Sequence, residues 1–285
     1  MSGIQNSSLF FWKMQGGGND FMVIDNRGRI FPEKTRPALV RKLCRRALGV
    51  GADGLILVEE AEAADFTCRF YNADGSEAEM CGNGGRCVAR FAFLQKLASA
   101  KMVFLTPAGA IRAQVDGDRV RLEMPRPHSL RQGLELEIEG ERIAVDFINS
   151  GVPHAILVVD CDPDPSWLLR QGAAIRRHPV FAPAGTNVNF VRIVNERRLA
   201  IRTYERGVEA ETLACGTGSV AAALLLAVRG KVASPTAVVT GSGEILTIFY
   251  KQEGLDFSEV FLEGGAVIVY KGVLELVLPP TERVV

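Results

Sequence analysis

The sequence reads EAEMCGNG at residues 77–84 and EAETLACGTG at residues 209–218. Each segment is followed by an apolar run, so one cysteine begins a glycine-rich turn and a predicted helix in each half of the chain. Two equivalent thiols suit a reaction that removes a proton from one face of a carbon atom and returns a proton to the other face. The pattern therefore indicates a racemase or an epimerase.

The repeat extends beyond the two cysteines, Cys81 and Cys215, which lie 134 positions apart. Three further pairs of segments share this offset to within one residue: residues 51 and 185, residues 106–109 and 240–243, and residues 21–25 and 156–160. Because the order and the offset agree, we interpret the chain as a duplication of a half of about this length.

Short apolar segments bounded by Gly, Asp, Asn or Pro predict strands in both halves. In the first half they are residues 21–24, 55–58, 66–71, 102–105, 111–115 and 120–124. In the second half they are residues 155–159, 189–193, 199–204, 237–240, 245–250 and 260–262, and a last strand is predicted at 273–278. Helices are predicted at residues 37–48, 85–97, 165–176 and 219–229.

The two helices that follow the cysteines are apolar on nearly every side, which predicts burial all round. The predicted fold class is α+β: two pseudo-symmetric domains from an internal duplication, each a mixed or antiparallel β-sheet wrapped around a central apolar helix. We expect an N-terminal domain at 1–125, completed by a returning C-terminal strand at 265–285, and a C-terminal domain at 126–264. The active site is expected in the cleft between them.

Composition excludes several classes of function. The chain has 285 residues, with 33 Lys and Arg against 33 Asp and Glu, so no net charge attracts nucleic acid or an anionic membrane. Residues 1–11 lack the pattern of a secretion signal, and the longest purely apolar stretch, 220–228, is far shorter than the roughly 20 residues that span a bilayer. We expect a cytoplasmic protein with no nucleic-acid or membrane partner.

The cysteine and histidine pattern does not indicate a metal site or a disulfide framework. The six cysteines include no Cys-x-x-Cys pair, and the three histidines are scattered. A chain of this length has enough apolar residues for a core without disulfides. Four cysteines are predicted to be small buried hydrophobic residues: Cys44, Cys68, Cys87 and Cys161.

The turns after Cys81 and Cys215 suit anion binding. Glycines let the backbone approach a ligand, and a helix N-terminus offers unpaired N–H groups and partial positive charge. The same field lowers a cysteine pKa from about 8.5 into the range of roughly 3.5–7.5. Two such turns would hold one carboxylate with a sulfur on each side of the adjacent carbon. The alternatives are purely structural turns or a redox-active pair of thiols.

The run NADGSEAEMCGNGGR at residues 72–86 resembles the signature of the diaminopimelate epimerase family. Four other segments match that family in order: KMQGGGNDF at 13–21, GVPH at 151–154, GTNVNF at 185–190, and YERG at 204–207 leading to CGTG at 215–218. The resemblance covers almost the whole chain, from about Phe11 to Leu278.

The resemblance implies a cofactor-independent isomerase that interconverts LL-2,6-diaminopimelate and meso-2,6-diaminopimelate by two-base proton transfer at Cα. This reaction serves lysine and peptidoglycan precursor biosynthesis. The family uses no pyridoxal phosphate and no metal. We also expect a homodimer whose only other partner is the small-molecule substrate.

The resemblance also assigns roles residue by residue. Cys81 and Cys215 are the expected acid and base, and His154 and Glu205 are expected to tune their pKa values. The expected carboxylate-binding residues are Gly82, Asn83, Gly216 and Thr217. The residues expected to bind the rest of the substrate are Asn19, Asn72, Asn187, Glu205 and Arg206.

Each polar residue has a plainer alternative. Asn19 and Asn72 lie beside Gly or Asp and are typical turn residues. For Asn187 the alternative is a role in its loop alone. For His154 it is a hydrogen-bonded imidazole in the core, and for Arg206 it is a solvated surface charge. The chain also has Val152 and Gly54 where some family members have Asn and Gln, so backbone groups or neighbours such as Asp53 would have to replace those contacts.

Two rival functions remain at this stage. One is an epimerase of the related proline and hydroxyproline racemase group, whose small substrates would leave nothing for Arg206 to bind. The other is a non-catalytic amino-acid-binding or thiol-redox protein, which would not exchange the Cα hydrogen.

Overall fold

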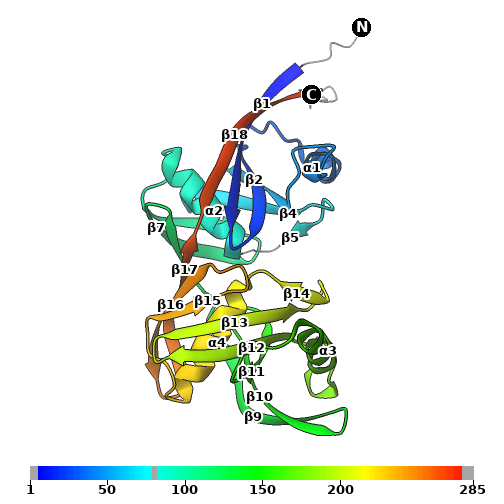
Figure 1. Ribbon diagram of the computed structural model, residues 1–285. Helices are drawn as coiled ribbons and strands as arrows, with labels where there is room; N and C mark the ends of the chain where they lie inside the picture. Colours follow the sequence, from blue (N-terminus) through cyan, green and yellow to red (C-terminus); the bar gives the residue numbers. More distant parts are fainter. Residues whose placement is uncertain (1–5, 79–81, 278–285) are drawn as a thin grey trace. The chain divides into compact units, whose positions relative to one another are not determined.

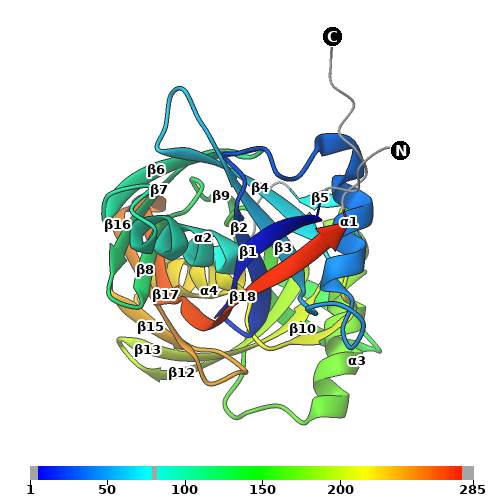
Figure 2. The ribbon, with the colours of Figure 1, turned by 90° about the horizontal axis from the view of Figure 1, so that it is seen from above.

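The computed structural model describes residues 6–78 and 82–277. The chain divides into two compact units. The first comprises Met1–Val115 with Ala266–Val285, and the second comprises Asp116–Gly265. The last strand thus joins the unit that contains the beginning of the chain, and in Figures 1 and 2 the red strand β18 runs beside the blue strand β1.

The first unit is built on a mixed sheet. Its strands are β1 (Asn6–Gly16), β2 (Asn19–Asp25), β3 (Gly54–Glu59), β4 (Phe66–Asn72), β5 (Glu77–Ala78), β6 (Lys101–Thr106), β7 (Gly109–Asp116) and β18 (Val267–Val277). The pairs β18–β1, β1–β2, β3–β4, β4–β5 and β6–β7 are antiparallel, whereas β2–β3 and β4–β6 are parallel.

The helical segments of the first unit are η1 (Glu33–Thr35), α1 (Arg36–Cys44) and α2 (Gly82–Leu94). Helix α2 is buried over most of its length and lies against β1, β2 and β3. The ring of Phe91 on α2 meets Trp12 of β1 edge to face, with ring centroids 5.0 Å apart. An aromatic contact of this kind adds to the stabilisation from burial alone.

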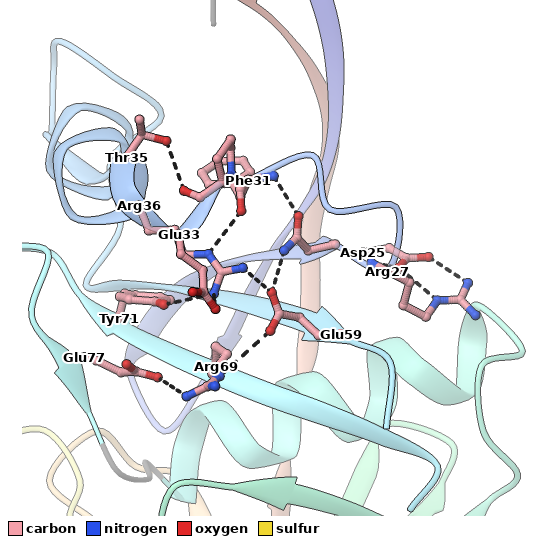
Figure 3. A network of polar contacts seen from close by, with 12 residues as sticks. Asp25, Arg27, Phe31, Glu33, Thr35, Arg36, Glu59, Arg69, Tyr71 and Glu77 are labelled. Carbon is pink, nitrogen blue, oxygen red and sulfur yellow. Dashed lines mark hydrogen bonds and ion pairs between the residues drawn. The ribbon is translucent and has the colours of Figure 1, made fainter. Parts of the chain in front are cut away.

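A polar network joins α1 to the sheet of the first unit (Figure 3). Arg36 lies buried at the start of α1, and its guanidinium contacts Glu59 Oε1 on β3 at 2.5 Å. Arg69 on β4 lies near the other oxygen of Glu59 and also forms a 3.0 Å ion pair with Glu77 on β5. The network therefore positions β5, which immediately precedes the segment of Cys81.

The second unit repeats the plan. Its strands are β8 (Arg119–Glu123), β9 (His128–Ile138), β10 (Glu141–Asn149), β11 (Pro153–Val158), β12 (Asn187–Asn195), β13 (Arg198–Glu205), β14 (Ala210–Thr212), β15 (Thr236–Val239), β16 (Ile245–Glu253) and β17 (Asp256–Gly265). The pairs β11–β12 and β13–β15 are parallel, and the remaining pairs of this unit are antiparallel.

The core of the second unit surrounds one helix. Its helical segments are α3 (Pro165–Arg176), η2 (Pro179–Phe181) and α4 (Gly216–Val228). All residues of α4 from Gly218 to Ala227 are buried, and the largest part of the core gathers around them (yellow in Figure 1). Helix α3 has a smaller core of its own against β12 and β13.

The pairing pattern confirms the predicted duplication. In each unit a parallel pair, β2–β3 or β11–β12, is followed by an antiparallel strand, then by a very short strand, and then by the apolar helix α2 or α4. The next strand then pairs in parallel with the antiparallel one, as β4–β6 or β13–β15. The predicted α+β class with a central apolar helix is likewise confirmed.

The structure differs from the prediction in three long strands, in the bounds of several elements and in one cysteine. Helix α1 ends at Cys44, four residues before its predicted end, and β18 begins at Val267, six residues before its predicted start. The sequence did not predict β1, β9 or β10, and β9 carries many charged residues on an exposed face, which hides the strand pattern. Helices α2 and α4 begin three residues earlier than predicted, because the glycines of each turn are already helical. Cys161 is exposed in the turn after β11, so its predicted burial was wrong, while Cys44, Cys68 and Cys87 are buried as predicted.

Within the described part of the chain, no helix has both the length and the apolar character needed to span a membrane.

Candidate active site

Cys215 is the N-cap residue of α4 and is only 8% exposed. Its backbone is extended, with φ −125° and ψ 110°, and its carbonyl accepts hydrogen bonds from the backbone N–H and the hydroxyl of Ser219. The sulfur therefore lies at the positive end of the helix, where a thiolate is stabilised relative to a thiol.

Thr217 connects this thiol to His154. The Thr217 hydroxyl lies 3.5 Å from Cys215 Sγ and 2.9 Å from His154 Nε2. His154 comes from β11 and is fully buried. Ser150 donates to the Thr217 carbonyl at 2.8 Å, which holds the first turn of α4 against the end of β10.

Behind His154 lies a second layer of polar groups. Asn189 on β12 brings its Nδ2 to 3.1 Å from His154 Nδ1 and donates to the Ala155 carbonyl at 3.1 Å. Thr203 on β13 donates its hydroxyl to Asn189 Oδ1 at 2.9 Å. The result is a continuous line of hydrogen bonds from β13, through β12 and β11, to the N-terminus of α4.

Gly218 makes this approach of helix and strands possible. A Cβ atom at residue 218 would lie 2.3 Å from Asn189 Oδ1 and 3.3 Å from His154 Cε1. The first distance is far below van der Waals contact, so any side chain at this position would displace the helix or Asn189.

Asn187, Glu205 and Arg206 form a second group in the same unit. Asn187 is buried, and its Oδ1 accepts from the backbone N–H of Arg206 at 2.8 Å. Burial raises the pKa of Glu205 above its usual range, partly offset by the hydroxyl of Thr212. The Arg206 guanidinium donates to the Ala184 carbonyl, and among the described residues it forms no ion pair.

In the first unit, Cys81 lies outside the described residues, while Gly82 and Asn83 begin α2. Asn83 is buried and donates its Nδ2 to Asn19 Oδ1 at 2.8 Å. Asn19 in turn donates to Asp53 Oδ2 at 3.1 Å. Asn19 and Asn83 thus occupy the places that His154 and Thr217 occupy in the second unit.

A cluster of charges holds Asp53 in place. Arg46 contacts Asp53 at 2.9 Å and Asp20 at 2.7 Å, and Lys13 forms a 2.7 Å ion pair with Asp20. Burial alone would raise the pKa of Asp20, but the hydrogen bonds from Arg46 and Lys13 outweigh this and lower it to about 2. Asp53 therefore serves to position Asn19.

Asn72 makes its hydrogen bonds within its own turn. Its Nδ2 donates to Ser76 Oγ at 3.0 Å, and its backbone N–H and C=O close the same turn. Its side chain is exposed, so the structure supports a turn-forming part for Asn72.

Gly54 is held tightly at the start of β3. A Cβ atom there would lie 2.7 Å from the Tyr71 carbonyl oxygen and 3.5 Å from the ring of Phe21. Any side chain at this position would require the local backbone to shift.

Known proteins of one family are similar to this chain over almost its whole length. The family model described as diaminopimelate epimerase matches residues 11–128 and 147–269. The diaminopimelate epimerase of Aquifex aeolicus (strain VF5) is 45% identical over 92% of this chain and 96% of its own length. That of Archaeoglobus fulgidus is 40% identical over 94% of this chain and 97% of its own length.

The chain belongs to the diaminopimelate epimerase family. Membership confirms the predicted class, an isomerase with diaminopimelate epimerase activity in lysine biosynthesis.

Solved structures of similar fold are more distant. A phenazine biosynthesis protein of the PhzF family from Bacillus anthracis has a TM-score of 0.72 at 15% identity, covering 95% of this chain and 100% of that one. A probable proline racemase from Agrobacterium radiobacter K84, with bound carbonate, has a TM-score of 0.67 at 16% identity, covering 96% and 94%. At these identities the likeness concerns the fold alone.

Sequence reasoning missed Asn189 and Thr203, which complete the line of hydrogen bonds behind His154. The signal for Asn189 was present, because an Asn between Val188 and Phe190 is a polar residue inside an apolar strand. Such a residue must be hydrogen-bonded when it is buried. Thr203 gave no such signal, since Thr is common in strands.

No group of three or more His, Cys, Asp or Glu that could hold a metal ion occurs within residues 6–78 and 82–277.

The buried imidazole predicts a specific dependence of stability on pH. Burial, aided by the positive charge of Arg206, lowers the pKa of His154 from 6.5 to about 3. Between these values the unfolded chain binds a proton that the folded chain does not, so the free energy of unfolding falls as the pH falls. At pH 5 the expected loss from His154 is about 2 kcal/mol.

His154→Gln should remove this part of the pH dependence, as measured by urea unfolding at pH 8 and pH 5. The exposed His128, replaced by Gln, is the matched control and should keep the wild-type dependence. Equal pH dependence in wild type and His154→Gln would contradict a buried neutral imidazole.

Proposed function

We propose that this chain interconverts LL- and meso-diaminopimelate by a two-base mechanism in which Cys81 and Cys215 face opposite sides of the substrate Cα. The observation that carries the proposal is the placement of Cys215 at the N-terminus of α4, in a chain 45% identical to a diaminopimelate epimerase over 92% of its length. The same sequence pattern, Cys-Gly-x-Gly before an apolar helix, occurs at Cys81.

The proton balance needs no added reagent. One sulfur acts as thiolate and takes the Cα proton, so an S–H bond forms as the C–H bond breaks and the electron pair stays on Cα. The other sulfur, as a thiol, gives its proton to the opposite face of Cα. The protein then carries the same number of protons as before, with the two thiols in exchanged states, and no cofactor is required.

The helix N-termini are proposed to bind the carboxylate next to the reacting carbon. The first N–H groups of a helix have no partner within the helix, and they favour an anion. Gly216 and Thr217 provide such groups in α4, and Gly82 and Asn83 provide them in α2. These donors also stabilise the negative charge that develops on the carboxylate as the proton leaves.

The distal end of the substrate carries one ammonium and one carboxylate group. We assign the carboxylate to Arg206, whose guanidinium is held by the Ala184 carbonyl, and the ammonium to Glu205. Asn187 orients this turn through the Arg206 backbone N–H, and amide groups at Asn19 and Asn72 complete the proposed set. A bidentate contact between guanidinium and carboxylate gives both charge and direction.

Loss of the Cα proton is the first test. The reduced protein with LL-diaminopimelate in deuterium oxide, and no cofactor, should exchange the Cα proton for deuterium and form the meso isomer, as followed by proton NMR.

Cys81→Ala and Cys215→Ala should each abolish epimerisation, and Cys161→Ala, at an exposed cysteine, should keep the wild-type rate. Near-normal turnover by either of the first two variants would contradict the two-base mechanism. Exchange with proline instead of diaminopimelate would assign the chain to the proline racemase type.

Arg206 provides a second test, directed at substrate specificity. Arg206→Gln removes the charge proposed to meet the distal carboxylate, so KM for diaminopimelate should rise by about tenfold or more. Arg198→Gln, at an exposed position on β13, is the control and should leave KM unchanged. An unchanged KM in Arg206→Gln would show that the distal carboxylate is bound elsewhere.

The mechanism requires reduced thiols, which favours the cytoplasm as the proposed location. Thiols are kept reduced in the cytosol, whereas disulfides form and persist in oxidising compartments. A Cys81–Cys215 disulfide would remove both the acid and the base. Cell fractionation with an antibody against the chain would test the location, and recovery outside the cytoplasm would contradict it.

We further propose that the enzyme is a homodimer. Five large apolar side chains on β1 and β18 are exposed: Phe10, Val267, Val269, Tyr270 and Val273. Phe10 and Val273 lie opposite each other in the β1–β18 register, so their exposed side chains are neighbours. Exposed apolar side chains that adjoin one another are typical of an interface. Sedimentation equilibrium should give twice the chain mass of 30.9 kDa, and Val269→Lys should shift it toward the monomer. A monomer mass for the wild type at micromolar concentration would contradict the proposal.

A further inference from the structure

The orientation of the Asn189 amide is fixed by its neighbours. The Ala155 carbonyl is only an acceptor, so the atom 3.1 Å from it must be the amide nitrogen. The hydroxyl of Thr203 then donates to the amide oxygen at 2.9 Å, which agrees with the same orientation. Asn189 is fully buried between strands, so it has little freedom to turn over.

This orientation decides the tautomer of His154. The second N–H of the Asn189 amide points to His154 Nδ1 at 3.1 Å, so Nδ1 must be an unprotonated acceptor. A neutral imidazole then carries its proton on Nε2. A doubly protonated ring would place two N–H groups against each other, and burial of the ring and the nearby charge of Arg206 also disfavour it.

The tautomer in turn sets the direction of the last two hydrogen bonds. His154 Nε2–H donates to Thr217 Oγ1 at 2.9 Å, which leaves the hydroxyl proton of Thr217 free to point to Cys215 Sγ at 3.5 Å. A hydrogen bond donated to a sulfur stabilises its thiolate over its thiol.

We propose that Asn189 is a positioning residue that holds His154 in the Nε2–H tautomer, so that Thr217 donates its hydroxyl proton to the thiolate of Cys215. Asn189 touches neither the substrate nor the sulfur and acts through two other side chains. The proposal rests on the proposed role of Cys215 and deepens it, since it selects Cys215 as the thiolate of the free enzyme.

The equivalent bonds of the first unit run in the opposite direction. There the helix residue Asn83 donates to the strand residue Asn19, which donates to the carboxylate of Asp53. The carboxylate of Asp53 can only accept, so each N–H donor in this line points away from the N-terminus of α2. The two units therefore have similar hydrogen-bond spacings beside the helix N-terminus, but the bonds run in opposite directions. This difference favours opposite protonation states for the two cysteines.

The wild-type protein can be tested directly. The chain has three histidines, so ¹⁵N-histidine labelling gives a spectrum that can be assigned with single His→Gln variants. Long-range ¹H–¹⁵N correlation should show His154 as the neutral Nε2–H tautomer at pH 7. An Nδ1–H tautomer or an imidazolium at His154 would overturn the proposal without any further variant.

Asn189→Asp replaces the donor with an acceptor of the same shape. A carboxylate in this place draws the proton to Nδ1, so the spectrum should change to the Nδ1–H form or to the imidazolium. The kcat for epimerisation should fall by about tenfold or more, within the contribution expected of a positioned acid or base, while KM stays the same.

Asn195→Asp is the matched control. Asn195 lies exposed at the end of the same strand, and an Asp there keeps the acceptor for the Arg197 N–H. This variant should preserve the His154 tautomer and kcat. If Asn189→Asp kept the Nε2–H tautomer, or changed the tautomer with kcat unaffected, the positioning role would be wrong.

The NMR result does not depend on the substrate, so it separates this proposal from the proposed function. A correct tautomer in a protein that does not exchange the Cα proton of diaminopimelate would contradict the function and leave the assignment of the tautomer intact. Full epimerase activity with the wrong tautomer would contradict only the role of Asn189.

Discussion

Helix α4 has no polar face, and this constraint governs the second unit. Each fully buried Leu or Val contributes about 1.5–3 kcal/mol, so the helix can be stable only when strands enclose it. Enclosure brings its N-terminus against the ends of β11 and β12, where His154 and Asn189 lie. The approach is close enough that only glycine fits at residue 218. The position of the thiol is thus a consequence of how the core is filled.

The same arrangement recurs in the first unit, with equivalent ion pairs in front of each cysteine segment. Arg69 pairs with Glu77 between β4 and β5, and Arg202 pairs with Glu211 between β13 and β14 in two bonds of 2.6 and 2.7 Å. Each pair fixes the short strand that leads to a cysteine turn. Because these strands have only two or three residues, their own ladders could not hold them alone.

The duplicated halves have kept their backbone plan and diverged in the side chains that adjoin the helix N-termini. A histidine and a threonine in one unit correspond to two asparagines in the other, at hydrogen-bond distances of 2.9 and 2.8 Å. An imidazole can carry its proton on either nitrogen, whereas an amide has fixed donors and acceptors. Divergence at these positions therefore changes the direction of the hydrogen bonds beside each helix N-terminus and keeps their spacing.

The sequence by itself determined the duplication, the α+β class, the two central helices and the family, because apolar runs and glycine-rich turns act locally and leave a pattern along the chain. It did not reveal β1, β9 or β10, and charged residues on the exposed face of β9 hide its strand pattern. It also misjudged Cys161. Only the tertiary structure decided the partners of the polar residues. Asp53 proved to be a support for Asn19, and Asn189 and Thr203 joined His154, because hydrogen bonds between strands connect residues whose separation in sequence carries no signal.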